Sequence, residues 1–184
     1  GEVRGAVVFG HDVTERRAAL QLAEMSRVSI QNLFLEMPVG IATFEGPDHV
    51  CTLANPTFLE TLFPRPRKFV GLPIRQSFPE GQEQGYIEIL DGVYRTGEST
   101  SGIESPAVIR EPDGSERTVY LNFVTQPRRD SKGAIEGTLV VLYDVTEQYF
   151  AKRDIEKAVR VRDEFLSIAS HELRTPVTGM KLQT

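Results

Sequence analysis

Hydrophobic and polar positions repeat with two different periods, and the changes of period divide the chain into three parts. Residues 14–37 contain no Gly or Pro and carry apolar or small side chains at intervals of four and three, which is typical of a helix. Between 39 and 143, short apolar runs alternate with turn residues, as expected for strands. Beyond residue 146 the helical period returns.

The middle part predicts a hairpin followed by a three-stranded meander. The predicted strands are 39–44, 50–53, 103–110, 116–126 and 135–143. Turn-forming sequences such as Pro112-Asp113-Gly114 separate neighbouring runs. Two helices, 57–63 and 86–96, lie between hairpin and meander and are joined by irregular chain rich in Pro and Gly. This order predicts an α+β fold: a five-stranded antiparallel sheet with short helices on one face, flanked by long N- and C-terminal linker helices.

An internal repeat indicates where strands pass into helices. GEVRGAVVFGHDVTERR (1–17) and GAIEGTLVVLYDVTEQY (133–149) share glycines, an apolar run and Asp-Val-Thr-Glu at an offset of 132 residues. Asp followed three residues later by Glu is a helix-start signature. We therefore expect strands to lead directly into helices at Asp12 and Asp144. Residues 1–13 then form the last strand of a preceding domain, and 14–37 form a linker helix.

Composition supports a folded domain and disfavours two kinds of partner. Hydrophobic residues make up 40% of the 184 residues, enough for a core, and charged residues make up 26%. The net charge of −5 leaves no basic surface for nucleic acid, so we expect no nucleic-acid partner. The longest strongly apolar run, 138–143, is far shorter than the roughly 18–20 residues of a membrane helix, so no membrane contact is expected within this chain.

The single cysteine, Cys51, excludes an internal disulfide and a multi-cysteine metal site. A reducing, cytoplasmic location is therefore expected. Because the chain begins with Gly in a predicted strand, we expect it to be a piece of a longer protein, whose upstream sequence could attach it to a membrane.

Several short motifs, in this order, resemble those of PAS domains over residues 33–146. They are Asn55, the segment 71–78, Val93-Tyr94-Arg95-Thr96-Gly97-Glu98, Glu111-Pro112-Asp113-Gly114-Ser115, and 137–147. The resemblance implies that 38–146 form a PAS domain and that 1–17 are the tail of another one.

The C-terminal helical part contains Phe165-Leu166-Ser167-Ile168-Ala169-Ser170-His171-Glu172-Leu173-Arg174-Thr175-Pro176, which resembles the phosphoacceptor box of sensor histidine kinases. The resemblance implies that 147–184 hold a signalling helix and the start of the dimerisation and phosphoacceptor domain. His171 would accept a phosphoryl group from ATP and pass it to an Asp of a response-regulator receiver domain. Glu172 would serve as general base and orient the imidazole, and Thr175 would position a water for dephosphorylation.

Helical geometry is consistent with the role of His171. Ala169 and Leu173 belong to an apolar stripe, and His171 lies about 200° around the helix from each of them, so it points away from the stripe. The boxes that bind ATP and Mg²⁺ in this family are absent, so the 184 residues alone should be inactive and hold no cofactor.

Two interpretations of the PAS core stay open: a domain without ligand that dimerises or relays a signal, and a small-molecule pocket. The candidate pocket residues are Phe44, Leu53, Phe58, Ile87, Val108, Leu121, Phe123 and Leu142. A flavin photosensor requires a reactive Cys in an Asn-Cys-Arg helix, whereas Cys51 lies in a predicted strand. A haem sensor requires an axial His, commonly on helix 86–96, which has none. We therefore expect neither flavin nor haem, and no metal.

Both long helices carry a stripe with spacing 4, 3, 4, 3, 4. The positions are Ala19, Ala23, Ser26, Ile30, Leu33 and Met37, and Ile155, Val159, Arg162, Leu166, Ala169 and Leu173. This pattern predicts a homodimer through the helical linkers, with docking on the chain's own domain as the alternative. Asp144 and Thr146 would be the joint through which a signal passes. The alternative function is a non-catalytic PAS binding or dimerisation module that feeds a different output domain.

Overall fold

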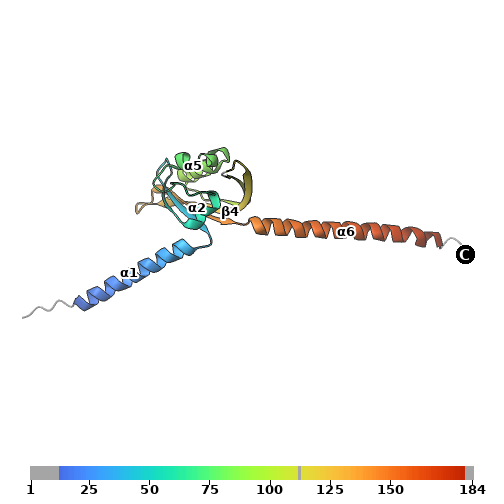
Figure 1. Cartoon of the computed structure of the whole chain (residues 1–184), viewed down its shortest axis with the longest axis horizontal. Helices are drawn as coiled ribbons and strands as arrows, with labels where there is room; N and C mark the ends of the chain where they lie inside the picture. The colour runs from blue at the N-terminus through green and yellow to red at the C-terminus, as the bar shows by residue number, and fades with distance from the viewer. Residues whose placement is uncertain (1–12, 112, 181–184) are drawn as a thin grey trace, which may run out of the picture.

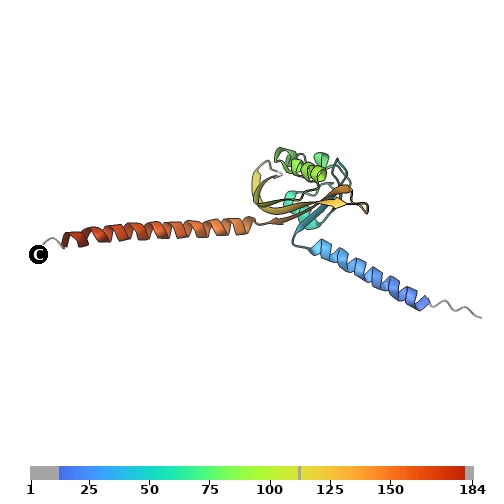
Figure 2. The same ribbon diagram turned by 180° about the vertical axis from the view of Figure 1, so that it is seen from behind.

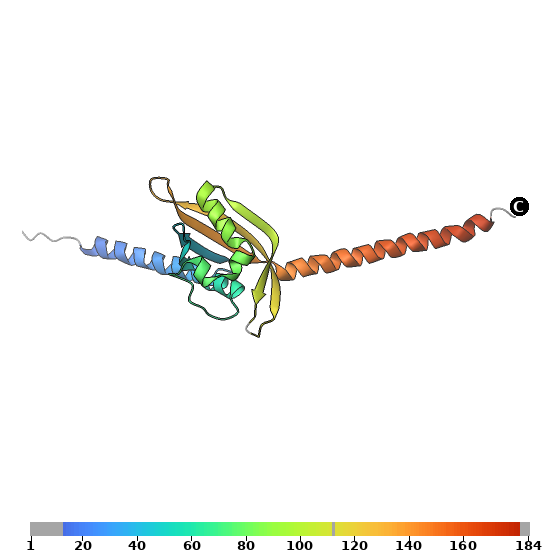
Figure 3. The same cartoon turned by 90° about the horizontal axis from the view of Figure 1, so that it is seen from above.

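A five-stranded antiparallel sheet carries four short helices on one face, and a long helix leaves the domain at each end (Figure 1, Figure 3). The computed structural model describes residues 13–111 and 113–180, with side chains in the last helix described as far as Ala169. The elements are α1 (Val13–Glu36), β1 (Gly40–Glu45), β2 (Val50–Ala54), α2 (Pro56–Leu62), α3 (Ile74–Ser77), α4 (Glu80–Glu83), α5 (Tyr86–Thr96), β3 (Thr100–Arg110), β4 (Glu116–Arg129), β5 (Ile135–Asp144) and α6 (Thr146–Met180). The predicted α+β fold is confirmed.

The strands lie in the order β2-β1-β5-β4-β3, so the last strand of the chain occupies the centre. β5 pairs with β1 on one side and with β4 on the other, both antiparallel. Because β5 passes almost directly into α6, the C-terminal helix starts from the middle of the sheet rather than from an edge.

Each edge strand of the sheet bonds at one position to another part of the chain. On β3, the side-chain amide of Gln84 donates to the Val108 carbonyl (3.0 Å) and accepts from the Val108 N–H (2.7 Å). On β2, the Cys51 N–H donates to Leu72 and the Cys51 carbonyl accepts from Gly71, at 3.0 and 2.7 Å. At Val108 and Cys51 the edge strands therefore do not offer free backbone groups for pairing with a further strand.

The core lies between the sheet and the short helices. Helix α5 supplies Ile87, Leu90 and Val93 at intervals of three, all buried against the sheet. It ends at Gly97, whose φ of 72° is the left-handed conformation that glycine adopts at little cost. The sheet contributes apolar side chains such as Phe44, Leu121 and Leu142 from its covered face.

The predicted elements agree closely with the structure, with one exception. Helix 86–96 has the predicted bounds, and each of the five strands is found within three residues of its predicted ends. The chain predicted to be irregular between α2 and α5 contains the single-turn helices α3 and α4. Helices of one turn leave no periodic pattern long enough to recognise. The strand predicted at 1–13 lies almost wholly outside the described residues.

Helices α1 and α6 point away from the domain in different directions (Figure 1, Figure 2). Several predicted stripe positions are uncovered, with 65% of Ile30 and 59% of Leu33 exposed on α1, and 66% of Ile155 and 53% of Leu166 on α6. At these described positions, neither stripe docks on the chain's own domain. Within the described part of the chain, none of the helices combines the length and apolar character needed to cross a bilayer.

Candidate functional site

An apolar cavity of about 60 Å³ lies between the sheet and the short helices. Its walls come from β1, β4, β5, α2, α3 and α5, and from the chain between α2 and α5. The lining residues are Phe44, Phe58, Leu62, Phe69, Ile74, Phe78, Tyr86, Ile89, Leu90, Leu121, Phe123, Thr125, Val140 and Leu142. None of these described lining residues is charged at neutral pH. The cavity therefore favours uncharged, apolar contents, because an ion here would lose its hydration without a partner.

Five of the eight predicted pocket residues line this cavity. They are Phe44, Phe58, Leu121, Phe123 and Leu142. Ile87 is fully buried in the adjoining core but is not part of the lining. Whether the cavity holds a ligand stays a prediction.

The placement of Leu53 and Val108 in the pocket is wrong. Leu53 is 45% exposed because a bulge between Thr43 and Phe44 pairs Phe44 with Cys51 and Thr43 with Leu53, which turns Leu53 to the open face. Val108 is 36% exposed, and its neighbours in β3, Ala107 and Ile109, are the buried ones. Since side chains alternate along a strand, an error of one position moves a residue to the other face.

Sequence reasoning missed the part of the lining that comes from the irregular chain. We call residues 63–85, between α2 and α5, the roof. Phe69, Ile74 and Phe78 of the roof line the cavity. The available signal was the presence of three phenylalanines in a stretch otherwise rich in Pro, Gly and charge. Large apolar side chains such as phenylalanine are mostly buried in folded proteins, so three of them in one segment indicate that it folds over a core.

Cys51, considered above for flavin, and His49, a histidine of the PAS core, are both buried. His49 is 1% exposed, and its Nε2 lies 2.9 Å from Oδ1 of Asp91, whose other oxygen accepts from Arg75 at 2.7 Å. Cys51 is fully buried in β2, and burial raises the pKa of its thiol to about 11. Its thiol is therefore protonated and unreactive at neutral pH. No three His, Cys, Asp or Glu side chains in the described chain lie together as a metal site would require.

The joint between β5 and α6 brings Asp144 and Thr146 together. Oδ1 of Asp144 accepts from the Thr146 N–H at 2.9 Å and from the Thr146 hydroxyl. The same hydroxyl oxygen accepts from the Tyr120 N–H of β4 at 2.9 Å, and the Tyr120 carbonyl accepts from the Val145 N–H at 2.8 Å. The predicted helix start is therefore fastened to the neighbouring strand as well as capped.

Two further contacts, absent from the sequence prediction, hold the first turns of α6 against the sheet. The rings of Tyr149 and Tyr120 stack with centroids 3.5 Å apart. Lys152 donates to Glu104 of β3 at 2.9 Å, and this contact raises the pKa of Lys152. Glu104 has a φ of 49°, an uncommon value for a residue other than glycine, and its N–H donates to the Asn122 side chain at 2.8 Å.

The predicted phosphoacceptor residues lie on the last part of α6. The helix continues without interruption from Thr146 to Met180 and so includes positions 171, 172 and 175. The side chains of His171, Glu172 and Thr175 lie outside the described residues, so their proposed roles stay predictions.

The sheet, its short helices and the two helix junctions match a known family. The family model described as PAS fold matches residues 34–149, which are the sheet, the short helices and both junctions with the long helices. The chain belongs to the PAS family. The predicted resemblance over 33–146 is thereby confirmed.

Curated relatives of this PAS chain are bacterial sensor kinases. It is 28% identical to the sensor histidine kinase WalK of Bacillus subtilis over 176 residues, which cover 96% of this chain and 26% of WalK. It is 52% identical to the alginate biosynthesis sensor protein KinB of Pseudomonas aeruginosa over 59 residues, covering 32% of this chain and 8% of KinB. The chain thus spans about a quarter or less of the length of these relatives.

Solved structures show the same fold at low sequence identity. The PAS domain of BvgS from Bordetella pertussis matches with a TM-score of 0.52 and 17% identity, covering 74% of this chain and 98% of that one. The VqmA dimer of Vibrio cholerae matches with a TM-score of 0.51 and 22% identity, covering 66% and 52%.

Proposed function

We propose that this chain is the sensory and signal-relay segment of a two-component sensor histidine kinase. In the longer protein, His171 accepts the γ-phosphoryl group of ATP and passes it to an Asp of a response-regulator receiver domain. ATP and Mg²⁺ bind to a catalytic domain outside these 184 residues. The kinship with WalK over 96% of the chain and the phosphoacceptor-like sequence around His171 support this proposal.

The observation that carries the relay is the direct path from the sheet to position 171. A single 35-residue helix, α6, begins one residue after β5, the central strand of the sheet. His171 follows Thr146 by 25 positions, which corresponds to about 38 Å along a helix at 1.5 Å per residue. A continuous helix transmits a rotation or tilt at its start to its distant end. The joint at Asp144 and Thr146 is therefore the place where a change in the PAS core would reach the phosphoacceptor.

Contacts at the joint connect it to the cavity wall. Phe123 lines the cavity, and its ring packs so closely on Gly102 that a Cβ at that glycine would lie 2.3 Å from it. Two residues after Gly102, Glu104 accepts from Lys152 of α6. The pairing of β3 with β4 is irregular between Gly102 and Ser105. A displacement of Phe123 would press on this part of β3, and the Glu104–Lys152 contact would carry that displacement to α6.

The working form is proposed to be a homodimer through α1 and α6. The uncovered apolar positions on both helices support it, because a helix that exposes a stripe at a period near 3.5 buries it against another helix. A dimer would also hold two copies of α6 side by side.

The phosphoacceptor is tested in the full-length protein with radiolabelled ATP. We expect an acid-labile, base-stable label that His171→Gln abolishes, because glutamine offers no nucleophilic ring nitrogen. His11→Gln is the matched control and should retain the label. Label of that stability surviving in His171→Gln would exclude this site. No such label in the unsubstituted protein would favour the alternative, a PAS module that feeds a different output domain.

The relay is tested separately at the joint. Thr146→Val keeps the shape of the side chain but removes the hydroxyl that links Asp144 to the Tyr120 N–H. We expect the autophosphorylation rate of the full-length protein to change several-fold, whereas Thr146→Ser, which retains the hydroxyl, should preserve it. An unchanged rate in both Thr146→Val and Asp144→Ala would refute the role of the joint.

A further inference from the structure

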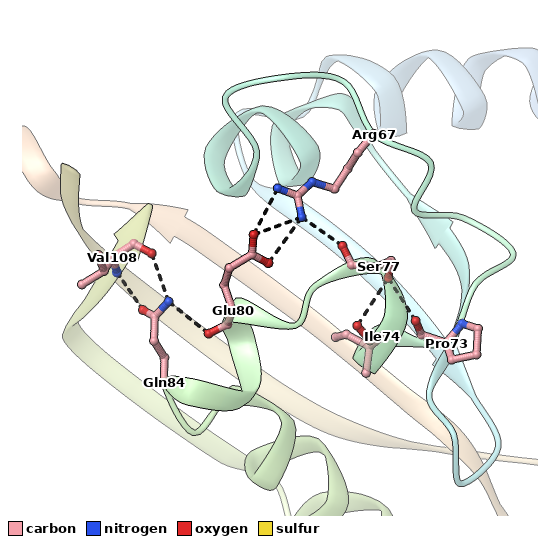
Figure 4. A network of polar contacts seen from close by, with 7 residues as sticks. All are labelled: Arg67, Pro73, Ile74, Ser77, Glu80, Gln84 and Val108. Carbon is pink, nitrogen blue, oxygen red and sulfur yellow. Dashed lines mark hydrogen bonds and ion pairs between the residues drawn. The ribbon is translucent and has the colours of Figure 1, made fainter. Parts of the chain in front are cut away.

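The two faces of the sheet differ in what covers them. The roof and the short helices lie over one face, where Gln84 bonds to the Val108 backbone within a network of polar contacts (Figure 4). We call the opposite side the open face. At one end of the open face, the ring of Tyr149 in α6 stacks on Tyr120 of β4. The centre of this face lies beyond that contact.

Apolar side chains gather at the centre of the open face. Ile41, Val141 and Val124 stand opposite one another on β1, β5 and β4, so they form a row across the sheet. Leu53 and Tyr143 lie on either side of this row and, like Val124, are 38–45% exposed. Large apolar side chains gathered in one exposed patch are typical of an interaction surface.

Paired charges border this apolar patch. At one end, Arg128 of β4 lies 2.8 Å from Glu136 and 3.6 Å from Glu45. At the other end, Lys152 donates to Glu104 at 2.9 Å. An apolar centre with a polar rim is the usual arrangement of a protein interface. Because the charges of the rim pair with one another, the patch favours an occupant that is apolar and uncharged.

Helix α1 presents a surface of this kind. Four of its apolar residues are 59–71% exposed: Leu22, Met25, Ile30 and Leu33. They span about 140° of the helix at 100° per residue. The charged residues between positions 17 and 35, which are Arg17, Glu24 and Arg27, lie on the opposite side. A face of this width is typical of a helix that packs on a broad surface, whereas a coiled coil uses a narrower seam.

The dimensions of the helix and the patch also match. From Leu22 to Leu33 the helix rises about 17 Å at 1.5 Å per residue, and β2 to β4 span about 14 Å at about 4.8 Å between strands. The chain's own α1 is held off this face, because the side chains of Asn55 and Thr57 donate to carbonyls at its C-terminal end. From that end, α1 runs away from the domain (Figure 1).

We propose that the open face is the docking surface for α1 of a second copy of this chain. Each α1 then lies across β2, β1, β5 and β4 of its partner. Each chain supplies one such helix and one such face, so a twofold dimer makes the same contact twice. This inference rests on the proposed homodimer and assigns α1 to the partner's sheet rather than to the partner's α1.

Cysteine crosslinking between two copies tests the docking. Two versions of the 184-residue chain are co-expressed with different affinity tags, one with Leu22→Cys or Leu33→Cys and the other with Val124→Cys. Cys51 is buried and should not react. We expect a short bismaleimide to join the two chains in at least one of the two pairings. Glu88→Cys, exposed on α5 over the covered face, replaces Val124→Cys as the matched control and should give at least tenfold less crosslink.

Sedimentation equilibrium measures the strength of the same contact. Leu22→Glu and Val124→Glu each set a carboxylate against an apolar surface, so we expect each to raise the Kd of the dimer at least tenfold. Gln31→Glu adds the same charge on the opposite side of α1 and should leave the Kd unchanged. Leu22 lies on an exposed helix, so Leu22→Glu still tests the contact if Val124→Glu fails to fold.

Four results would overturn the docking. Crosslinks between two Leu22→Cys chains, with none to Val124→Cys, would mean that α1 pairs with α1 and would leave the homodimer intact. Equal crosslinking to Glu88→Cys, or an unchanged Kd in Leu22→Glu, would contradict the contact itself. A monomer at all concentrations would exclude both the docking and the homodimer. Phosphorylation of His171 is not among these readouts, so the docking and the proposed phosphoacceptor fail independently.

Discussion

Asn55 is a side chain whose removal should cost the domain much of its stability. It is fully buried and makes four hydrogen bonds to backbone groups. Its Oδ1 accepts from the N–H groups of Ile41 (2.8 Å) and Phe58 (3.0 Å), and its Nδ2 donates to the carbonyls of Phe34 (3.2 Å) and Val39 (2.8 Å). One amide group therefore caps α2, holds the start of β1 and fastens the end of α1.

Asn55→Ala leaves all four of these backbone groups without their partner. A net contribution of about 1 kcal/mol per bond gives a loss of about 3–5 kcal/mol, allowing some groups to find water. This is a large share of the roughly 5–15 kcal/mol by which domains are stable. Asn55→Asp should also destabilise strongly, because it retains the acceptor but sets a second carboxylate oxygen against the carbonyls of Phe34 and Val39.

The assay is urea unfolding followed by far-UV circular dichroism, which yields the free energy of unfolding. Asn122→Ala serves as the control, because Asn122 accepts a single bond, from the Glu104 N–H, and its loss should cost about 1 kcal/mol. If Asn55→Ala costs no more than the Asn122→Ala control, the four bonds do not act together and the reasoning is refuted.

Three further substitutions or reactions test the packing and the buried thiol. Gly92→Ala, in α5 with open space around the new Cβ, should stabilise the domain by about 0.5–1 kcal/mol in urea unfolding, and a loss of stability would contradict this. Gly137→Ala should destabilise it by about 3 kcal/mol, because its Cβ would lie 1.9 Å from the Phe44 carbonyl oxygen; stability equal to that of the unsubstituted protein would contradict the β1–β5 pairing. The Cys51 thiol, with a pKa of about 11 against 9.0 in the unfolded chain, should react with Ellman's reagent at pH 8 only as urea unfolds the domain. Its contribution to stability is complete below pH 9 and should decline as the pH rises from 9 to 11, which urea unfolding at several pH values measures.

Local patterns in the sequence were sufficient for most of the secondary structure. The Gly-free and Pro-free stretch before Pro38, the interval of three between Ile87, Leu90 and Val93, and the stop at Gly97 are local signals, and the corresponding helices have nearly the predicted bounds. The pocket was predicted less well. The outward positions of Leu53 and Val108 depend on pairing with other strands, and a bulge changes which residues face inward.

The sequence by itself determined the order of the elements, the PAS resemblance and the position of the phosphoacceptor-like box, because each depends on residues close together in the chain. The tertiary structure alone decided which residues cover one side of the cavity and what holds α6. The roof covers the cavity because Arg67 meets Glu80, and Gln84 reaches Val108, across 13 and 24 residues. Likewise Lys152 meets Glu104 across 48 residues. Contacts between such distant residues follow from how the sheet and helices pack, which no local period encodes.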